Sequence, residues 1–176
     1  MANQTIDQVA RLFCQATKKT LDKSTGKSLK YANTLQDIPK VSLKPAVGCF
    51  VQFNGDYNGL VIMNFSAGAA MELYRSYMLT MGMPESELAN DYTSAEVVDT
   101  IGEMTNQIMG RALRMVESNY ELSSNMGQPK AIALNSAITL TPESEYQVSR
   151  RLSFSLETHR FYMELSLERT EFIAMK

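Results

Sequence analysis

The last third of the chain holds two runs in which apolar and polar residues alternate, and this pattern limits the fold more than any other feature. Leucine and phenylalanine take every second position between residues 152 and 156, and residues 161–167 repeat the pattern with Phe161, Met163, Leu165 and Leu167. A period of two is typical of strands that bury one face. The short link Thr158-His159 predicts that residues 150–157 and 161–168 pair as an antiparallel hairpin. Such a sheet is stable only when other elements cover its apolar face.

Three segments have the apolar spacing of helices that could supply this cover. They are residues 3–22, residues 67–81 and residues 94–119. Ser66 is expected to cap the second helix, and Gly82 with Pro84 beyond it to end that helix. Thr93 and Glu96 have the spacing of a capping box, so they are expected to open the third.

The remaining segments favour strands and turns. Residues 43–53 and 60–65 are rich in valine, phenylalanine and isoleucine and flank a turn-forming stretch, so they predict a second hairpin. We also expect a strand over residues 131–140, a short irregular strand within 31–39, a loop over 120–128 and a turn over 141–147. The order is helix, strands, helix, then helix, strands, so the second half loosely repeats the first. This order predicts an α+β fold with helices packed on an antiparallel-rich sheet.

Length and charge narrow the class of protein. The 176 residues suffice for one well-packed domain, so we expect residues 1–176 to form a single domain. The net charge of −2 and the lack of a Lys/Arg cluster among aromatic residues argue against nucleic-acid binding. No run reaches the roughly eighteen apolar residues of a membrane span, and residues 1–11 lack the features of a signal peptide. We therefore expect a cytoplasmic protein without a membrane segment, in which Cys14 and Cys49 are buried free thiols.

The third predicted helix carries Asp99, Glu103 and Asn106 at relative positions i, i+4 and i+7. At about 100° per residue these side chains lie within a sector of about 60°, and the apolar side chains of the helix lie opposite to them. Gly110 continues the polar column. Because a glycine within a helix costs about 1 kcal/mol relative to alanine, we expect Gly110 to leave room for another group to approach the backbone beside Asn106.

Two interpretations of this column are open. Three polar residues on a helix are most often a solvated face. Asparagine is a mediocre helix former, however, and its use here favours a functional role. Pro129 follows Asn106 after a gap of 22 residues. Asp or Ser, Glu, Asn and Pro at these four positions relative to one another should occur by chance in about one chain in several hundred of this size.

With Asp99, Glu103, Asn106 and Pro129 in these positions, the chain resembles the CheC/CheX/FliY family of phosphatases, which dephosphorylate the chemotaxis response regulator CheY. The order of helices and strands fits that family over most of the chain, whereas the specific motif is confined to residues 99–129. The resemblance implies a CheC-like fold over residues 1–176. As a function it implies hydrolysis of the aspartyl phosphate of a CheY-like receiver domain, in chemotaxis or related two-component signalling.

The resemblance also implies a role for each motif residue. In that family the phosphatase supplies neither a nucleophile nor a metal. Glu103 would pair with a lysine of the regulator, and Asn106 would orient a water molecule for in-line attack on phosphorus. Asp99 and Pro129 would support the site without taking part in the chemistry, and Gly110, which is not part of the family's motif, would support it through the room that it leaves. No cofactor of the protein's own is expected, and Mg²⁺ is expected in the partner regulator.

The first helix departs from the family's two-site members, which carry a second Glu-x-x-Asn there. In this chain Asp7 is followed at the same spacing by Arg11 and Cys14, so the first helix is expected to be inactive. The chain thus looks more like single-site CheX, whose members form dimers, and a homodimer is expected.

Other functions remain as alternatives. One is a non-catalytic relative that binds a regulator, and another is a dimerisation module. His159, the only histidine, is expected in a turn, and no His/Cys cluster has metal-ligand spacing.

Overall fold

The fold is that of a computed structural model, which describes residues 2–140 and 147–168. The helices are α1 (Ala2–Thr25), α2 (Ala67–Thr80) and α3 (Ala95–Tyr120), with a 3₁₀ turn η1 (Glu85–Glu87) between the last two. The strands are β1 (Lys30–Tyr31), β2 (Gln36–Asp37), β3 (Val41–Leu43), β4 (Val47–Gly55), β5 (Gly59–Phe65), β6 (Ser124–Met126), β7 (Lys130–Ala133), β8 (Ile138–Leu140), β9 (Gln147–Ser155) and β10 (Arg160–Glu168).

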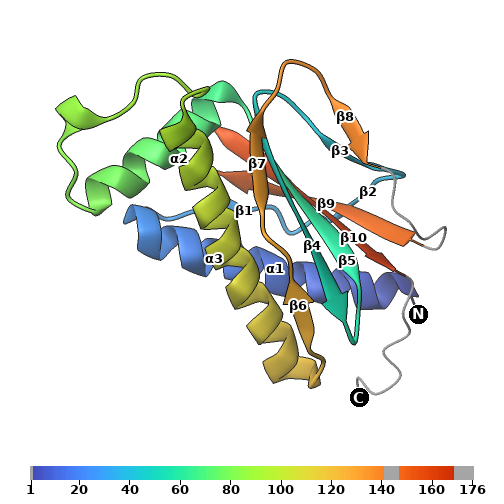
Figure 1. The fold of residues 1–176 in the computed structure, drawn as a ribbon. Coiled ribbons are helices and arrows are strands. Elements are labelled where there is room, and N and C mark those ends of the chain that lie inside the picture. Colours follow the sequence, from blue (N-terminus) through green and yellow to red (C-terminus); the bar gives the residue numbers. More distant parts are fainter. Residues whose placement is uncertain (1, 141–146, 169–176) are drawn as a thin grey trace.

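The strands form one large antiparallel sheet and one small one (Figure 1). The large sheet has the order β1-β9-β10-β5-β4-β6, and β2 pairs with β9 while β7 pairs with β4. The strands β3 and β8 form a separate two-stranded sheet. Side chains of the three helices share one core cluster with one face of the large sheet. The predicted α+β fold, with helices packed on an antiparallel-rich sheet, is confirmed.

The alternating runs at the end of the chain form the centre of this sheet. The strands β9 and β10 pair as the predicted hairpin, and β10 pairs on its other side with β5. Phe161 lies opposite Phe154 on one neighbour and opposite Phe65 on the other, with ring centroids 5.0 and 4.9 Å apart. This row of stacked rings ties three strands together on the face that the helices cover.

The opposite face of β10 carries a buried carboxylate. The side chain of Glu164 is fully buried beneath the small sheet and accepts a hydrogen bond from the backbone N–H of Ser42, at 2.9 Å. Its other oxygen lies 3.3 Å from the Arg151 guanidinium and 3.5 Å from the Lys44 ammonium. These bonds compensate for the loss of water around the charge and attach β3 to the large sheet.

Several predicted strands differ from the observed ones. The segment 43–53 is interrupted at Pro45, so β3 and β4 belong to different sheets. The segment 131–140 is likewise divided, because β7 pairs with β4 whereas β8 pairs with β3. The predicted loop 120–128 contains the short strand β6. Both β6 and β7 pair with β4, with β6 at residues 53–55 and β7 at residues 47–50 of that strand. The predicted turn over residues 141–147 lies almost wholly outside the described residues.

The start of α3 also differs from the prediction. Ser94, not Thr93, is the N-cap residue, and its hydroxyl accepts from the backbone N–H of Val97 at 3.3 Å. Glu96 does not complete a capping box, because its carboxylate accepts a hydrogen bond from the Tyr74 hydroxyl of α2 at 2.6 Å. The predicted cap of α2 is confirmed, since the Ser66 hydroxyl accepts from the backbone N–H of Ala69.

Both cysteines are buried as free thiols, as predicted. Burial raises the pKa of the Cys14 thiol to about 12 and that of the Cys49 thiol to about 11. Neither thiol is therefore ionised to a useful extent near neutral pH. Within residues 2–140 and 147–168, no helix is long and apolar enough to cross a membrane.

The burial of Glu164 yields a stability prediction. Glu164→Gln should lower the free energy of unfolding by about 2–4 kcal/mol, because it leaves Arg151 and Lys44 without their counter-charge. The measurement is urea unfolding followed by circular dichroism. The control is Glu157→Gln, which removes the exposed pair with Lys27 and should cost less than about 1 kcal/mol. Equal losses for the two variants would contradict a structural role for the buried carboxylate.

Candidate functional site

The two sides of α3 have opposite characters, as its sequence predicts. Val97, Ile101, Met104, Ile108, Ala112 and Val116 are buried against the core. On the other side, the side chains of Asp99, Glu103 and Asn106 are exposed. The apolar stripe therefore fixes the rotation of the helix and directs the polar column to solvent.

Pro129 lies beside this column. The strands β6 and β7 follow one another along β4, and Pro129 lies between them, directly before β7. Proline has no backbone N–H to donate to a neighbouring strand. It is tolerated here because it lies at the break between two short ladders, where no strand pairing is lost. The helix α3 packs on β7. The approach is close at Gly102, where an added Cβ would lie only 3.6 Å from the Cβ of Ala131.

The four motif residues consequently line one groove between α3 and β7. Its volume is about 640 Å³. It is lined by Val98, Asp99, Gly102, Glu103, Asn106, Gln128, Pro129, Lys130, Ala131 and Ile132. The fold thus brings together residues that are 30 positions apart in the sequence, with both carboxylates and the carboxamide on one wall.

The polar side chains of the groove have few partners of their own. The Glu103 carboxylate accepts one hydrogen bond from the Gln107 amide, at 3.2 Å. The side chains of Asp99 and Asn106 form no hydrogen bond or ion pair with any residue in the described part of the chain. The Asn106 amide can therefore both donate to and accept from an incoming group.

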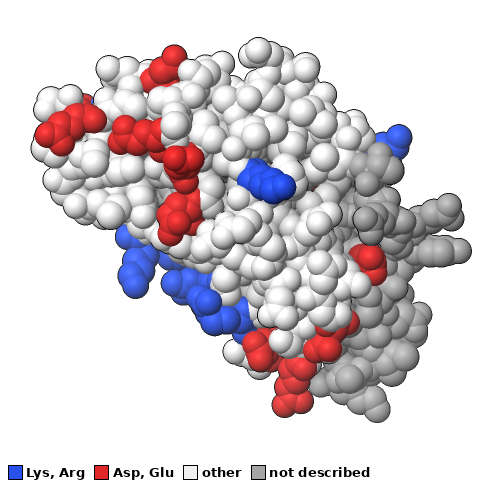
Figure 2. Space-filling view, in the orientation of Figure 1, with Lys and Arg blue, Asp and Glu red and all other residues white. Residues whose placement is uncertain are grey.

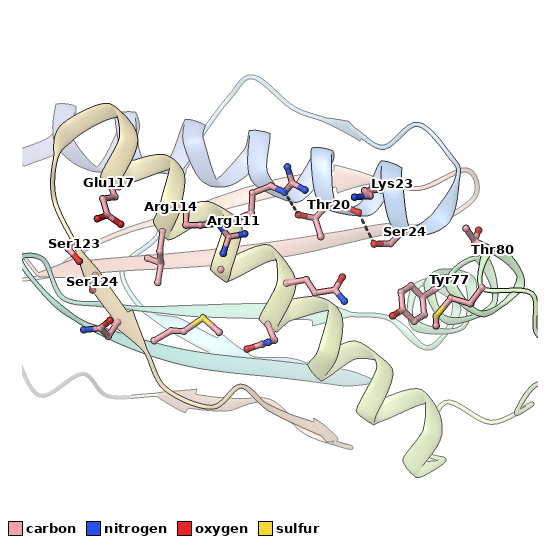
Figure 3. A pocket seen from close by; sticks show the side chains of 17 residues that line it. Thr20, Lys23, Ser24, Tyr77, Thr80, Arg111, Arg114, Glu117, Ser123 and Ser124 are labelled. Carbon is pink, nitrogen blue, oxygen red and sulfur yellow. Dashed lines mark hydrogen bonds between the residues drawn. The ribbon is translucent and has the colours of Figure 1, made fainter.

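Asn106 also lines a second, larger pocket on the other side of the column (Figure 3). This pocket has a volume of about 1010 Å³ and lies between α1, α3, β6 and the end of α2. Three of the side chains that line it are cationic, namely Lys23 of α1 and Arg111 and Arg114 of α3. Figure 3 shows Arg111 reaching across to α1, where its Nε donates to the Thr20 hydroxyl at 3.1 Å.

Gly110 lies in this second pocket and not in the groove with Pro129. A Cβ at Gly110 would lie 3.3 Å from an Nη1 atom of Arg114. The space above the glycine is therefore bounded by the Arg114 guanidinium, which folds back along the helix as long helical side chains do. The room expected beside Asn106 is present, but a cation borders it.

Sequence reasoning missed the three cations. At about 100° per residue Arg114 lies next to the polar column, so extending the helical wheel could have found it. Arg111 lies about 120° from Asp99, at the edge of the apolar stripe, and the wheel alone does not direct it to the site. Lys23 could not be found in this way, because it reaches the pocket through the packing of α1 against α3.

Charge is unevenly distributed over this face of the molecule. Figure 2 shows acidic side chains gathered over the upper left of the view, a group of basic side chains below them, and further acidic side chains lower down. The exposed carboxylates of η1 and the first half of α3 are Glu85, Glu87, Glu96, Asp99 and Glu103. Along α3 the charge is thus negative at Glu103, positive at Arg111 and Arg114, and negative again at Glu117.

The corresponding positions on α1 are used differently. Asp7 pairs with Arg150, whose Nε lies 2.9 Å from the Asp7 carboxylate and whose guanidinium also binds Asp37. Cys14 is 2% exposed, and Arg11 is exposed. The two positions of α1 that correspond to Glu103 and Asn106 thus hold Arg11 and Cys14, and the Asp7 carboxylate is engaged in an ion pair with the sheet.

The single histidine belongs to a separate cluster. His159 Nδ1 lies 2.5 Å from the Glu72 carboxylate, which also accepts a hydrogen bond from the Thr158 hydroxyl. Burial raises the pKa of Glu72, but the bonds from Thr158 and His159 outweigh this and lower it below its usual value. The cluster joins the β9–β10 turn to α2. No group of three or more His, Cys, Asp or Glu residues among the described residues is arranged to hold a metal ion.

Comparison with known families identifies the chain by sequence. The family described as "Protein of unknown function (DUF3334)" matches residues 2–176, so the chain belongs to this family. No curated protein matches the sequence.

Comparison with solved structures identifies the fold. The chemotaxis protein CheX from Desulfovibrio desulfuricans superposes with a TM-score of 0.73 at 20% identity, over 92% of this chain and 99% of that one. CheX from Vibrio vulnificus gives 0.75 at 19% identity, over 92% and 99%. A chain of the CheX–CheY–BeF3–Mg²⁺ complex from Borrelia burgdorferi gives 0.67 at 15% identity, over 92% and 97%. The predicted CheX-like fold is therefore confirmed.

The environment of Gly110 yields a second stability prediction. Gly110→Ala should raise the free energy of unfolding by about 0.5–1 kcal/mol, because alanine favours the helix and the Arg114 tip can move by a few tenths of an ångström. Thermal and urea unfolding measure this. The same substitution at Gly82, where φ is +89°, should instead lower stability. A loss of stability in Gly110→Ala would contradict the expectation that the Arg114 side chain can move away from the added methyl group.

Proposed function

We propose that this DUF3334 protein is a phosphatase that hydrolyses the aspartyl phosphate of a CheY-like response-regulator receiver domain. Asn106 orients the attacking water, and Glu103 docks a lysine of the regulator. The protein contributes no metal, and Mg²⁺ belongs to the partner regulator. The protein acts in the cytoplasm, in chemotaxis or a related two-component pathway, and the homodimer expected from the resemblance remains part of this proposal.

The groove that holds Asp99, Glu103, Asn106 and Pro129 is the observation that carries the proposal. A solvated helix face does not require a proline from a segment that lies far along the chain, whereas all four residues of the phosphatase pattern meet at this groove. The CheX-like fold adds support. One of the solved structures with this fold is the complex of CheX with CheY, BeF3 and Mg²⁺.

The chemistry fits an exposed carboxamide. In the reaction a water oxygen bonds to phosphorus while the bond from phosphorus to the aspartyl oxygen breaks. The electron pair stays with the aspartate carboxylate, and the water loses a proton to solvent or phosphate. The transition state is loose, so positioning matters more than a strong base. An amide can hold the water by donating and accepting without repelling the phosphoryl oxygens, as a carboxylate would.

Glu103 is suited to docking and not to proton transfer. Its side chain is exposed and lies one helical turn before Asn106 on the same face. An exposed carboxylate can pair with a lysine at the rim of the partner's site. Such a contact fixes the distance between Asn106 and the phosphoryl group, because both residues belong to one rigid helix.

Replacement of Asn106 tests the chemical step. Asn106→Ala should reduce the accelerated loss of phosphate by about 10²-fold or more, because the attacking water is no longer oriented. In the measurement, purified receiver domains of the host are phosphorylated with acetyl phosphate or phosphoramidate, and the release of phosphate is followed over time. Binding of the receiver should survive.

The control for this experiment is Asn119→Ala, the same change at an exposed position on α3 whose amide bonds only to the backbone of its own helix. It should leave turnover unchanged. If wild type and Asn106→Ala release phosphate at the same rate from every receiver tested, the protein is not this phosphatase. Binding without turnover by wild type would support the non-catalytic alternative.

Replacement of Glu103 tests docking. Glu103→Lys should raise the KM for the phosphorylated receiver roughly tenfold with little change in kcat, because a repulsive pair replaces an attractive one at the rim. The control is Glu121→Lys, which makes the same charge change at the C-terminal end of α3. A fall in kcat with an unchanged KM would contradict a docking role and indicate a chemical one.

A further inference from the structure

The second pocket carries three cationic side chains that form no ion pair within the part of the chain that the structure describes. Lys23, Arg111 and Arg114, here called the basic strip, form no ion pair with any residue in the described ranges 2–140 and 147–168. By contrast, the buried Arg150 is paired with two carboxylates. Glu117 also lines the pocket, at the side of β6, so the lining has three cations and one carboxylate.

The basic strip is continuous with the proposed active site. Asn106 lines both the groove that contains Glu103 and the pocket that contains the strip. A partner that places its phosphorylated residue at Asn106 must therefore cover part of the strip as well. The Arg111 guanidinium is held by Thr20 of α1, and the Arg114 guanidinium lies over Gly110 of α3, so the two groups lie in the pocket between these helices.

The same pocket offers an apolar contact. The Met81 side chain, at the end of α2, is 67% exposed and lines the pocket together with Tyr77. An exposed methionine and a tyrosine beside cations are typical components of protein–protein interfaces. The mixture of charged, aromatic and flexible apolar groups fits a protein surface as occupant.

We propose that the basic strip docks an acidic surface of the receiver domain next to its phosphorylation site, and so sets the orientation in which the receiver approaches Asn106. This proposal rests on the proposed function. A site that holds an aspartyl phosphate and a divalent cation must be rich in carboxylates, since oxygen ligands bind Mg²⁺. Glu103 binds the cationic part of the receiver's rim and the strip binds the anionic part. Glu103 on one side of Asn106 and the basic strip on the other thus favour one orientation of the receiver.

The test measures association rate constants at low and high salt. The probe is a receiver domain that wild type binds, loaded with BeF3 and Mg²⁺. The variant is the double change Lys23→Glu and Arg114→Glu, because both side chains are exposed and neither anchors the fold. The matched control is Lys30→Glu with Arg160→Glu, which makes the same change in net charge at exposed positions that line neither pocket.

The strip variant should associate about tenfold more slowly than the control at low salt, and most of that difference should disappear at 0.5 M salt. Equal association rates for the two double variants would overturn the proposal. Binding without hydrolysis by wild type would refute the phosphatase function while leaving the docking surface testable in the same experiment. If wild type binds no receiver, both proposals fail.

Discussion

Burial of the apolar stripe of α3 against the sheet is the constraint on which the site depends. The stripe cannot be exposed without loss of the core, so the rotation of the helix is fixed. That rotation directs Asp99, Glu103 and Asn106 outward, and it places β7 close enough for Pro129 to join them. A site made from one helix and one adjacent strand needs no mobile element to assemble its parts, because both belong to the same packed core.

The site has the properties of a surface that completes another protein's active centre. It has no nucleophile with an adjacent base, and the polar groups of its groove are exposed and largely without partners. Such groups contribute when a partner excludes water and brings the reacting atoms with it. Carboxylates lie before Asn106 on α3, the guanidinium groups of Arg111 and Arg114 follow it, and the Glu117 carboxylate lies beyond them. A partner with complementary charge would therefore be held in one orientation, with the amide at the point where the sign changes.

The sequence predicts the parts that follow from local periodicity. The period of two found the β9–β10 hairpin, and the period of 3.6 found α3 together with the side that carries Asp99, Glu103 and Asn106. The sequence alone could not place Pro129 beside these three residues, because the position of Pro129 depends on which strand pairs with β4. The prediction of Thr93 as the cap of α3 was wrong, because the neighbouring Ser94 caps the helix. Glu96 binds the Tyr74 hydroxyl and does not complete a capping box. Lys23 was missed because only the packing of α1 on α3 brings it near.

The most direct measurement is a crystal structure of the protein bound to a receiver domain loaded with BeF3 and Mg²⁺. The account predicts that α3 faces the phosphorylation site, with the Asn106 amide within hydrogen-bonding distance of a water in line with the acyl-phosphate bond. Glu103 should lie within ion-pair distance of a receiver lysine. A receiver bound to another surface of the protein, with Asn106 still exposed to solvent, would contradict the account.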